Sequence, residues 1–196
     1  MTTSNILSLQ IKKTSASRVV WLAVFIAVSS VIQIFDNELI PSSLPFKSGV
    51  ANVVTLIVIT SFGPVDAILV TAVRTILAAL VTGRLFSIPF LMSFSGGVAS
   101  AAVMGLLYGK FRELSIVGVS ITGAVTHNLV QLLLIYGLLI HNRGIFNLAP
   151  LLLTFSLLTG LMVGFLARAA INLPLLKKVT VNGVEKGTQQ HLSGLK

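Results

Sequence analysis

Residues 65–83 read VDAILVTAVRTILAALVTG, an apolar run that contains two charged residues, Asp66 and Arg74. A transmembrane helix needs about 20 mostly apolar residues, so this run is long enough to cross a bilayer. Backbone groups inside hydrocarbon have no water to bind, and a helix satisfies their hydrogen bonds internally. The run therefore predicts a membrane-spanning helix with an arginine near its middle.

Five further apolar runs surround this one, at residues 19–35, 49–62, 88–109, 115–140 and 145–170. None of them alternates between apolar and polar residues over about ten positions, as the strand of a membrane β-barrel does. The second run is the shortest and would span only a thin or tilted path. We predict an all-α membrane protein with six transmembrane helices over residues 18–170, an N-terminal tail (1–17) and a basic C-terminal tail (171–196).

The composition supports this class of protein. Of the 196 residues, 55% are hydrophobic and 10% are charged, whereas a soluble domain carries about 25% charged residues. The absence of cysteine excludes disulfides, thiolate metal sites and cysteine nucleophiles. A cleaved signal peptide is disfavoured, because the first run stays apolar beyond the candidate cleavage site at Ala27-Val28-Ser29.

The net charge of +9 is explained by membrane topology. With six helices and a cytoplasmic N-terminus, ten of the 14 Lys and Arg residues fall on the cytoplasmic side, three fall outside and Arg74 lies within the membrane. This distribution follows the positive-inside rule. We therefore expect both termini to be cytoplasmic, and the charge requires no nucleic-acid partner.

Arg74 is the first candidate site residue. A charge near the bilayer centre costs several kcal/mol and normally faces a polar cavity or a partner. Asp66 lies about 12 Å away along the helix, so the two residues are not expected to pair directly. The favoured hypothesis is that Arg74 binds an anionic group.

Polar residues in two other runs are further candidates. His127, Asn128 and Gln131 share one broad face of the fifth helix, and such groups are costly in a membrane unless they meet partners. Asn52 lies near the outer end of the second run. Each residue could join helices through hydrogen bonds or contact a ligand, and His127 could also relay protons. Together with Arg74 they predict a polar pocket open to the outside.

Small residues predict close helix contacts at two places. Gly96 and Gly97 interrupt the fourth run and favour close packing or a kink over a phosphate-binding loop. Ala23 and Ala27 form a small-xxx-small stripe in the first run, against which another helix can pack closely. That helix could belong to the same chain or to a separate subunit.

Catalytic motifs are missing from the sequence. The five acidic residues form no Asp-Asp-x-x-Asp cluster for Mg²⁺ and diphosphate, and no His-Glu-x-x-His zinc motif occurs. The three histidines fall in a run, a loop and a tail, so a shared metal site is not expected. A Walker A motif is also missing. We therefore expect that this chain is not an enzyme and that it binds neither a metal nor a cofactor. We also expect that it does not hydrolyse ATP itself.

Four segments carry a resemblance to a known family: residues 49–56 (GVANVVTL), Arg74, the step at 95–97 (SGG) and residues 118–131 (GVSITGAVTHNLVQ). Through them, residues 18–170 resemble the Gx transporter family, which is also catalogued as heptaprenyl diphosphate synthase component I. That family is similar to the substrate-binding S components of energy-coupling factor (ECF) transporters.

The resemblance implies an S-component-like bundle of six helices in the plasma membrane of a prokaryote. In such a fold the first loop, here residues 36–47, helps to cover a ligand pocket near the outer face. The stripe at Ala23 and Ala27 would meet a separate membrane coupling subunit, which is joined to a pair of ATPases.

The residues and the resemblance support two hypotheses. In the first, the chain is a subunit that binds a small solute for uptake and is energised by the separate coupling and ATPase subunits. Arg74 would supply charge to a solute with an anionic or strongly hydrogen-bonding part, and Asn52, His127, Asn128 and Gln131 would orient it. In the second, the chain is a non-catalytic membrane anchor or partner of an isoprenoid- or quinone-processing or electron-transfer complex.

Overall fold

The computed structural model describes residues 3–39, 49–111 and 113–174, and within these ranges the chain is helical and contains no strand. The elements are α1 (Thr3–Leu39), α2 (Ala51–Phe62), α3 (Pro64–Val81), α4 (Ile88–Lys110), α5 (Ile116–Leu138), the 3₁₀ helix η1 (Arg143–Leu148) and α6 (Ala149–Ile171). The prediction of an all-α protein is confirmed.

Most of these helices are suited to a membrane. Among the described residues, five stretches are long and apolar enough to cross a bilayer: Ala16–Asp36 in α1, the whole of α3, α4 and α5, and Arg143–Ile171, which contains α6. The exception is α2, whose 12 residues extend about 18 Å, against about 30 Å of hydrocarbon. By length and composition, the chain is thus a multi-pass helical membrane protein. The run that was predicted as its second span forms a helix of only 12 residues.

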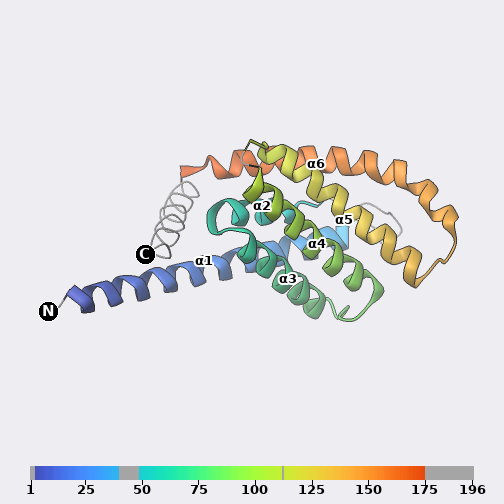
Figure 1. Ribbon diagram of the computed structural model, residues 1–196. Coiled ribbons are helices and arrows are strands. Elements are labelled where there is room, and N and C mark those ends of the chain that lie inside the picture. The colour runs from blue at the N-terminus through green and yellow to red at the C-terminus, as the bar shows by residue number, and fades with distance from the viewer. Residues whose placement is uncertain (1–2, 40–48, 112, 175–196) are drawn as a thin grey trace.

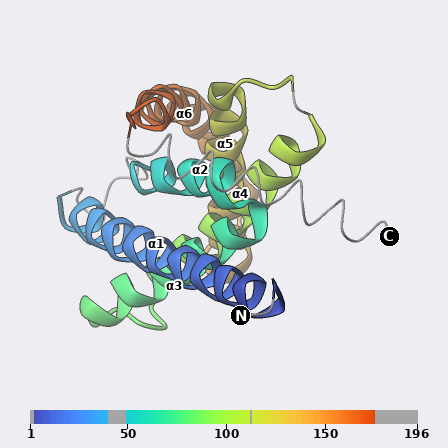
Figure 2. The same ribbon diagram turned by 90° about the vertical axis from the view of Figure 1, so that its left-hand side faces the viewer.

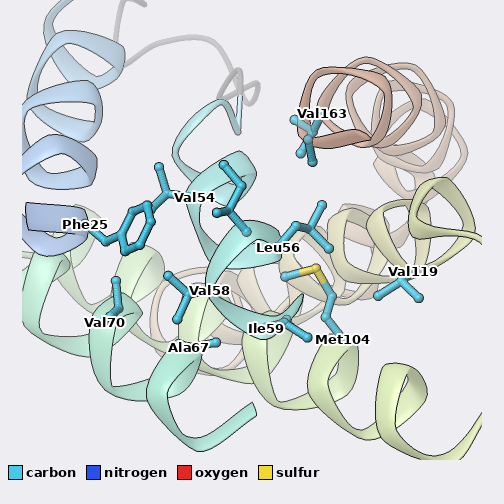
Figure 3. Close-up of a cluster of buried hydrophobic side chains, with 12 residues drawn as sticks. Phe25, Val54, Leu56, Val58, Ile59, Ala67, Val70, Met104, Val119 and Val163 are labelled. Atoms are coloured by element: carbon cyan, nitrogen blue, oxygen red, sulfur yellow. The ribbon is translucent and has the colours of Figure 1, made fainter. Parts of the chain in front are cut away.

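The short helix α2 lies inside the bundle. It runs between α1 and α6, which lie on opposite sides of it (Figures 1 and 2). Nine of its twelve residues are buried, and Val58 and Leu56 are 0% and 1% exposed. Figure 3 shows the apolar side chains that the other helices add to this core, among them Phe25, Val70, Met104, Val119 and Val163. Because protein covers α2, this helix does not need the length of a lipid-facing span.

Helix α1 is longer at both ends than the apolar run predicts. It begins at Thr3, so most of the expected N-terminal tail is helical, and it continues to Leu39 through the start of the expected first loop. No glycine or proline occurs in residues 3–39, and a helix propagates readily once it is nucleated. Pro41 is the first proline of the chain, and the position before a proline disfavours helix. Residues 40–47 of the loop and 175–196 of the C-terminal tail lie outside the described residues.

Two glycines bring α6 against the backbone of α5. A Cβ atom added to Gly160 would lie 2.7 Å from Cα of Ile121, and one added to Gly164 would lie 2.8 Å from Cα of Val117. Real side chains do not approach so closely, so only glycine fits at these positions. This Gly-x-x-x-Gly pair follows the small-xxx-small rule of membrane helices and is an addition to the predicted stripe in α1.

The predicted stripe at Ala23 and Ala27 lies on the outer face of α1. Both alanines are exposed, as are Val20, Val24 and Val28 beside them. No helix in the described part of the chain covers this face. Within the described residues, the stripe is therefore not an internal packing contact.

An ion pair joins α1 to α3 at the end of the bundle where α3 begins. Arg18 Nη2 lies 2.6 Å from Asp66 Oδ2, and Arg18 Nε donates to the same oxygen at 3.1 Å. Asp66 occupies the first turn of α3, where the helix dipole favours a negative charge. Asp66 is thus paired with Arg18, in agreement with the expectation that it does not pair with Arg74.

We expect Arg18→Gln and Asp66→Asn to be energetically coupled by about 1 kcal/mol in a double-mutant cycle. The Asp66 side chain is only 8% exposed although Arg18 is 54% exposed, so the pair is partly shielded from water. The free energy of unfolding in mixed micelles measures the coupling. The matched control is Arg84 and Glu38, 3.2 Å apart and 44% and 53% exposed, whose coupling should be close to zero. Equal couplings in the two cycles would contradict this expectation.

Candidate functional site

A small polar cavity lies where the six α-helices converge. The space that the centres of water molecules can occupy in it is about 50 Å³, which is enough for a few waters. Its lining residues are Gln33, Asp36, Gly49, Ala51, Asn52, Arg74, Thr75, Ser93, Gly97, Ala124, His127, Asn128 and Thr159. Polar groups inside an apolar bundle are costly unless they meet partners, so their convergence here marks the candidate site.

Four of the five predicted ligand-binding residues line this cavity: Asn52, Arg74, His127 and Asn128. The fifth, Gln131, is buried beside it. Gln131 Nε2 lies 2.9 Å from His127 Nε2, so Gln131 holds the imidazole ring of His127 from the neighbouring turn. The structure therefore brings the predicted residues together, with Gln131 behind the lining.

The guanidinium of Arg74 is anchored on the start of α2. Arg74 is 3% exposed; its Nη1 donates to the carbonyl oxygen of Ala51, and its Nη2 donates to Asn52 Oδ1 at 2.9 Å. Arg74 Nε has no hydrogen-bond partner among the described residues. A buried donor without a partner costs about 1–3 kcal/mol, so this edge of the guanidinium retains the capacity to bind an acceptor.

Asp36 places a carboxylate at the same cavity. It lies near the C-terminal end of α1, and it interacts electrostatically with Arg74. The sequence run ends at Phe35, and for this reason Asp36 was expected in a loop. Because α1 continues to Leu39, Asp36 shares a helix face with Gln33, three residues earlier. This i,i+3 spacing of two polar residues is the sequence signal that places them on one face; the arrangement of the helices turns that face to the cavity.

Three further lining residues, Thr75, Ser93 and Thr159, were not predicted. Thr75 Oγ1 donates to the backbone oxygen of Thr71 at 2.8 Å and lies 3.4 Å from Gln33 Oε1. Hydroxyl groups that bond their own helix backbone are common in membrane helices and carry no site signal alone. Only the arrangement of the helices identifies them.

Glycines let α4 pass close to the cavity. A Cβ atom on Gly96 would lie 3.1 Å from His127 Nδ1, and one on Gly97 would lie 3.2 Å from Thr71 Cγ2. The two glycines therefore admit α5 on one side of α4 and α3 on the other. The prediction that they serve close packing is confirmed.

Asn128 lines the cavity and also forms a hydrogen bond with a residue of α6. Its Nδ2 donates to Ser156 Oγ at 2.7 Å, and Ser156 in turn donates to the backbone oxygen of Leu152 at 2.7 Å. Ser156 is fully buried. Asn128 thus joins α5 to α6 and is also placed to contact a molecule in the cavity.

Ser156→Ala and Asn128→Ala separate these two roles. Each should lower the free energy of unfolding by about 1 kcal/mol, because each removes the same buried hydrogen bond. Only Asn128→Ala should also reduce the amount of small molecule that the purified protein retains. Thermal unfolding and mass spectrometry of the extracted small molecules measure the two effects. Equal retention by both variants would assign Asn128 to helix packing alone.

The lining of the cavity combines several kinds of polar group. It offers one guanidinium, one carboxylate, one imidazole, and amide and hydroxyl groups. Within residues 3–39, 49–111 and 113–174, no group of three or more His, Asp or Glu residues could hold a metal ion. These groups are suited to hold a small polar molecule by ion pairs and hydrogen bonds.

Comparison with known proteins identifies a family. Residues 25–170 match the model of the family described as heptaprenyl diphosphate synthase component I. The matched region contains every lining residue of the cavity, from Gln33 to Thr159. No curated protein and no solved structure matches the chain.

Proposed function

The chain belongs to the heptaprenyl diphosphate synthase component I family, and from this membership and the polar cavity we propose that it is a membrane subunit that binds a small solute for uptake. Its role would be that of an S component of an ECF transporter in the plasma membrane of a prokaryote. The observation that carries the proposal is Arg74, a buried guanidinium at a cavity inside an apolar bundle.

The geometry of Arg74 supports a ligand rather than a purely structural function. A structural arginine would have all of its donors satisfied by the protein, because an unpartnered buried donor destabilises the fold. Arg74 instead keeps Nε without a partner among the described residues, next to a space that admits water. A bound acceptor at this edge would give Nε the partner that it lacks among the described residues.

Transport would need partners, because the sequence contains no Walker A motif. In this proposal a membrane coupling subunit packs on the exposed stripe at Ala23 and Ala27 and connects the chain to a pair of ATPases. Small side chains allow a partner helix to approach the backbone closely. The chain itself would bind the solute without catalysing a reaction.

The printed name of the family favours one alternative, a non-catalytic partner of a prenyl diphosphate synthase. Prenyl transfer itself needs clustered carboxylates for Mg²⁺ and diphosphate, and the chain has five acidic residues in total. Two of these, Asp66 and Glu38, are in ion pairs with arginines. In this alternative the chain would anchor the enzyme at the membrane.

Two measurements on the native protein distinguish the proposals. The first is mass spectrometry of small molecules extracted from the chain purified in lipid nanodiscs; we expect one solute to be enriched over an unrelated membrane protein. The second is identification of the proteins that co-purify. An ATPase pair with a coupling subunit supports uptake. A prenyl or redox enzyme as the only partner, with no enriched solute, would replace the proposal by the alternative.

A further inference from the structure

We propose that the cavity selects a small zwitterion, a molecule of zero net charge with an anionic group bound at Arg74 and a cationic group directed to Asp36. This inference rests on the proposed solute-binding function and specifies the class of solute. Zwitterions are a narrower class of solute than the anions that Arg74 alone suggests.

The charges of the cavity are balanced. Among the lining residues that the structure describes, two have a formal charge at neutral pH, Arg74 on α3 and Asp36 on α1. Their charges are opposite in sign, and both side chains border the same small space. An uncompensated charge in a poorly hydrated interior is strongly unfavourable. A solute with a net charge would create such an imbalance. A zwitterion would leave the cavity neutral, because its anionic group would lie at Arg74 and its cationic group at Asp36.

Each pole has a group that can bind the complementary part of a zwitterion. Two nitrogens of Arg74 are used by α2, which leaves Nε for a carboxylate or phosphate oxygen. Asn52 accepts from Arg74 through its Oδ1, and its amide NH₂ is therefore a donor beside the anionic group. Asp36 is an acceptor and suits an ammonium group.

Solutes with only one charge would meet repulsion. A simple anion at Arg74 would lie near the carboxylate of Asp36, and a simple cation at Asp36 would lie near the guanidinium. In a site that holds only a few waters, such repulsion is weakly screened. The pair therefore acts against both classes of singly charged solute.

The test uses matched probes on the full chain in lipid nanodiscs. The zwitterions are glycine, β-alanine and 4-aminobutyrate. Their matched anions are acetate, propionate and butyrate, and their matched cations are methylamine, ethylamine and propylamine. At the length that fits, the amino acid should bind about tenfold or more tightly than its anion or cation, as measured by the shift of thermal unfolding with probe concentration.

Asp36→Asn should change the preference. Without the carboxylate, the matched anion should bind at least as tightly as the amino acid, a reversal of about tenfold or more relative to the wild type. Glu38→Gln is the matched control, since Glu38 lies two residues further on α1, is exposed and pairs with Arg84. This control should keep the wild-type preference for the zwitterion.

The outcomes separate the inference from the proposed function. Equal binding of amino acid and matched anion at every length, or an Asp36→Asn variant with the wild-type preference, would overturn the inference. Should Asp36→Asn fail to fold, the solute retained by the wild-type protein decides: one with both charges supports the inference, and one that lacks either charge overturns it while the uptake proposal stands. If no probe binds and no solute is retained, the proposed function and the inference both fall.

Discussion

Gly164→Leu is expected to prevent the chain from accumulating as a folded, monodisperse protein. Even the first carbon of a side chain at this position would lie 2.8 Å from Cα of Val117 and 3.1 Å from Cβ of Ser120. The obstacle is backbone, which cannot rotate away, so α6 would have to separate from α5. Overpacking by a single group costs about 1–3 kcal/mol, and leucine adds several groups to a fold whose total stability is typically about 5–15 kcal/mol.

The measurement is the yield of monodisperse protein in size-exclusion chromatography, followed by thermal unfolding. Gly137→Leu is the control, because Gly137 also lies in a long helix, α5, but is exposed with no atom within 4 Å of an added Cβ. It should express and unfold like the wild type. If both variants behave alike, close contact at Gly164 does not hold α5 and α6 together.

Arg74→Gln is expected to abolish retention of the solute that mass spectrometry identifies in the wild-type protein. Loss of one partner in a buried, charge-assisted interaction costs about 2–5 kcal/mol, which corresponds to a loss of affinity of roughly 30-fold to 5,000-fold. Glutamine is too short to bridge Ala51 and Asn52 as the guanidinium does. Arg74→Lys should recover little, since lysine keeps the charge but lacks the planar fork.

Solute bound per protein and calorimetric affinity measure this effect, with circular dichroism as the check that the variant folds. Arg84→Gln is the matched control: Arg84 is an exposed arginine that pairs with Glu38 and does not line the cavity. It should retain the solute fully. A folded Arg74→Gln variant with wild-type affinity would remove Arg74 from the site and leave solute binding itself in place.

The class of the fold and the central residue of the site, Arg74, could be predicted from the sequence. Both depend on the free-energy cost of placing a short stretch of residues in water or in the membrane. A run of apolar residues without charges has no stable place in water, and a lone arginine inside such a run requires a partner. These two rules identify the long helices and Arg74. Gln131 follows His127 and Asn128 by one helical turn, and this grouping of hydrogen-bonding side chains adds the three residues by the same reasoning.

The remainder depends on tertiary structure. The run at 49–62 is mostly apolar, as expected both of a short span and of a helix buried by protein; only the neighbouring helices distinguish the two. Asp36 was missed because a charge ends an apolar run without ending the helix. Gly164 is one of 16 glycines, and its importance comes from the backbone of Val117, which lies far away in the sequence.

Helix α1 extends far beyond the cavity that it borders near its C-terminal end. Its 37 residues measure about 55 Å, nearly twice the thickness of the hydrocarbon, and its N-terminal part extends past the other helices (Figure 1). Sharp kinks in helices arise mainly at proline, at glycine or at local irregularities, and α1 contains neither proline nor glycine. A tilt of α1 at Asp36, where it borders the cavity, would therefore be carried along a continuous helix, with a displacement at its N-terminal end that grows with distance.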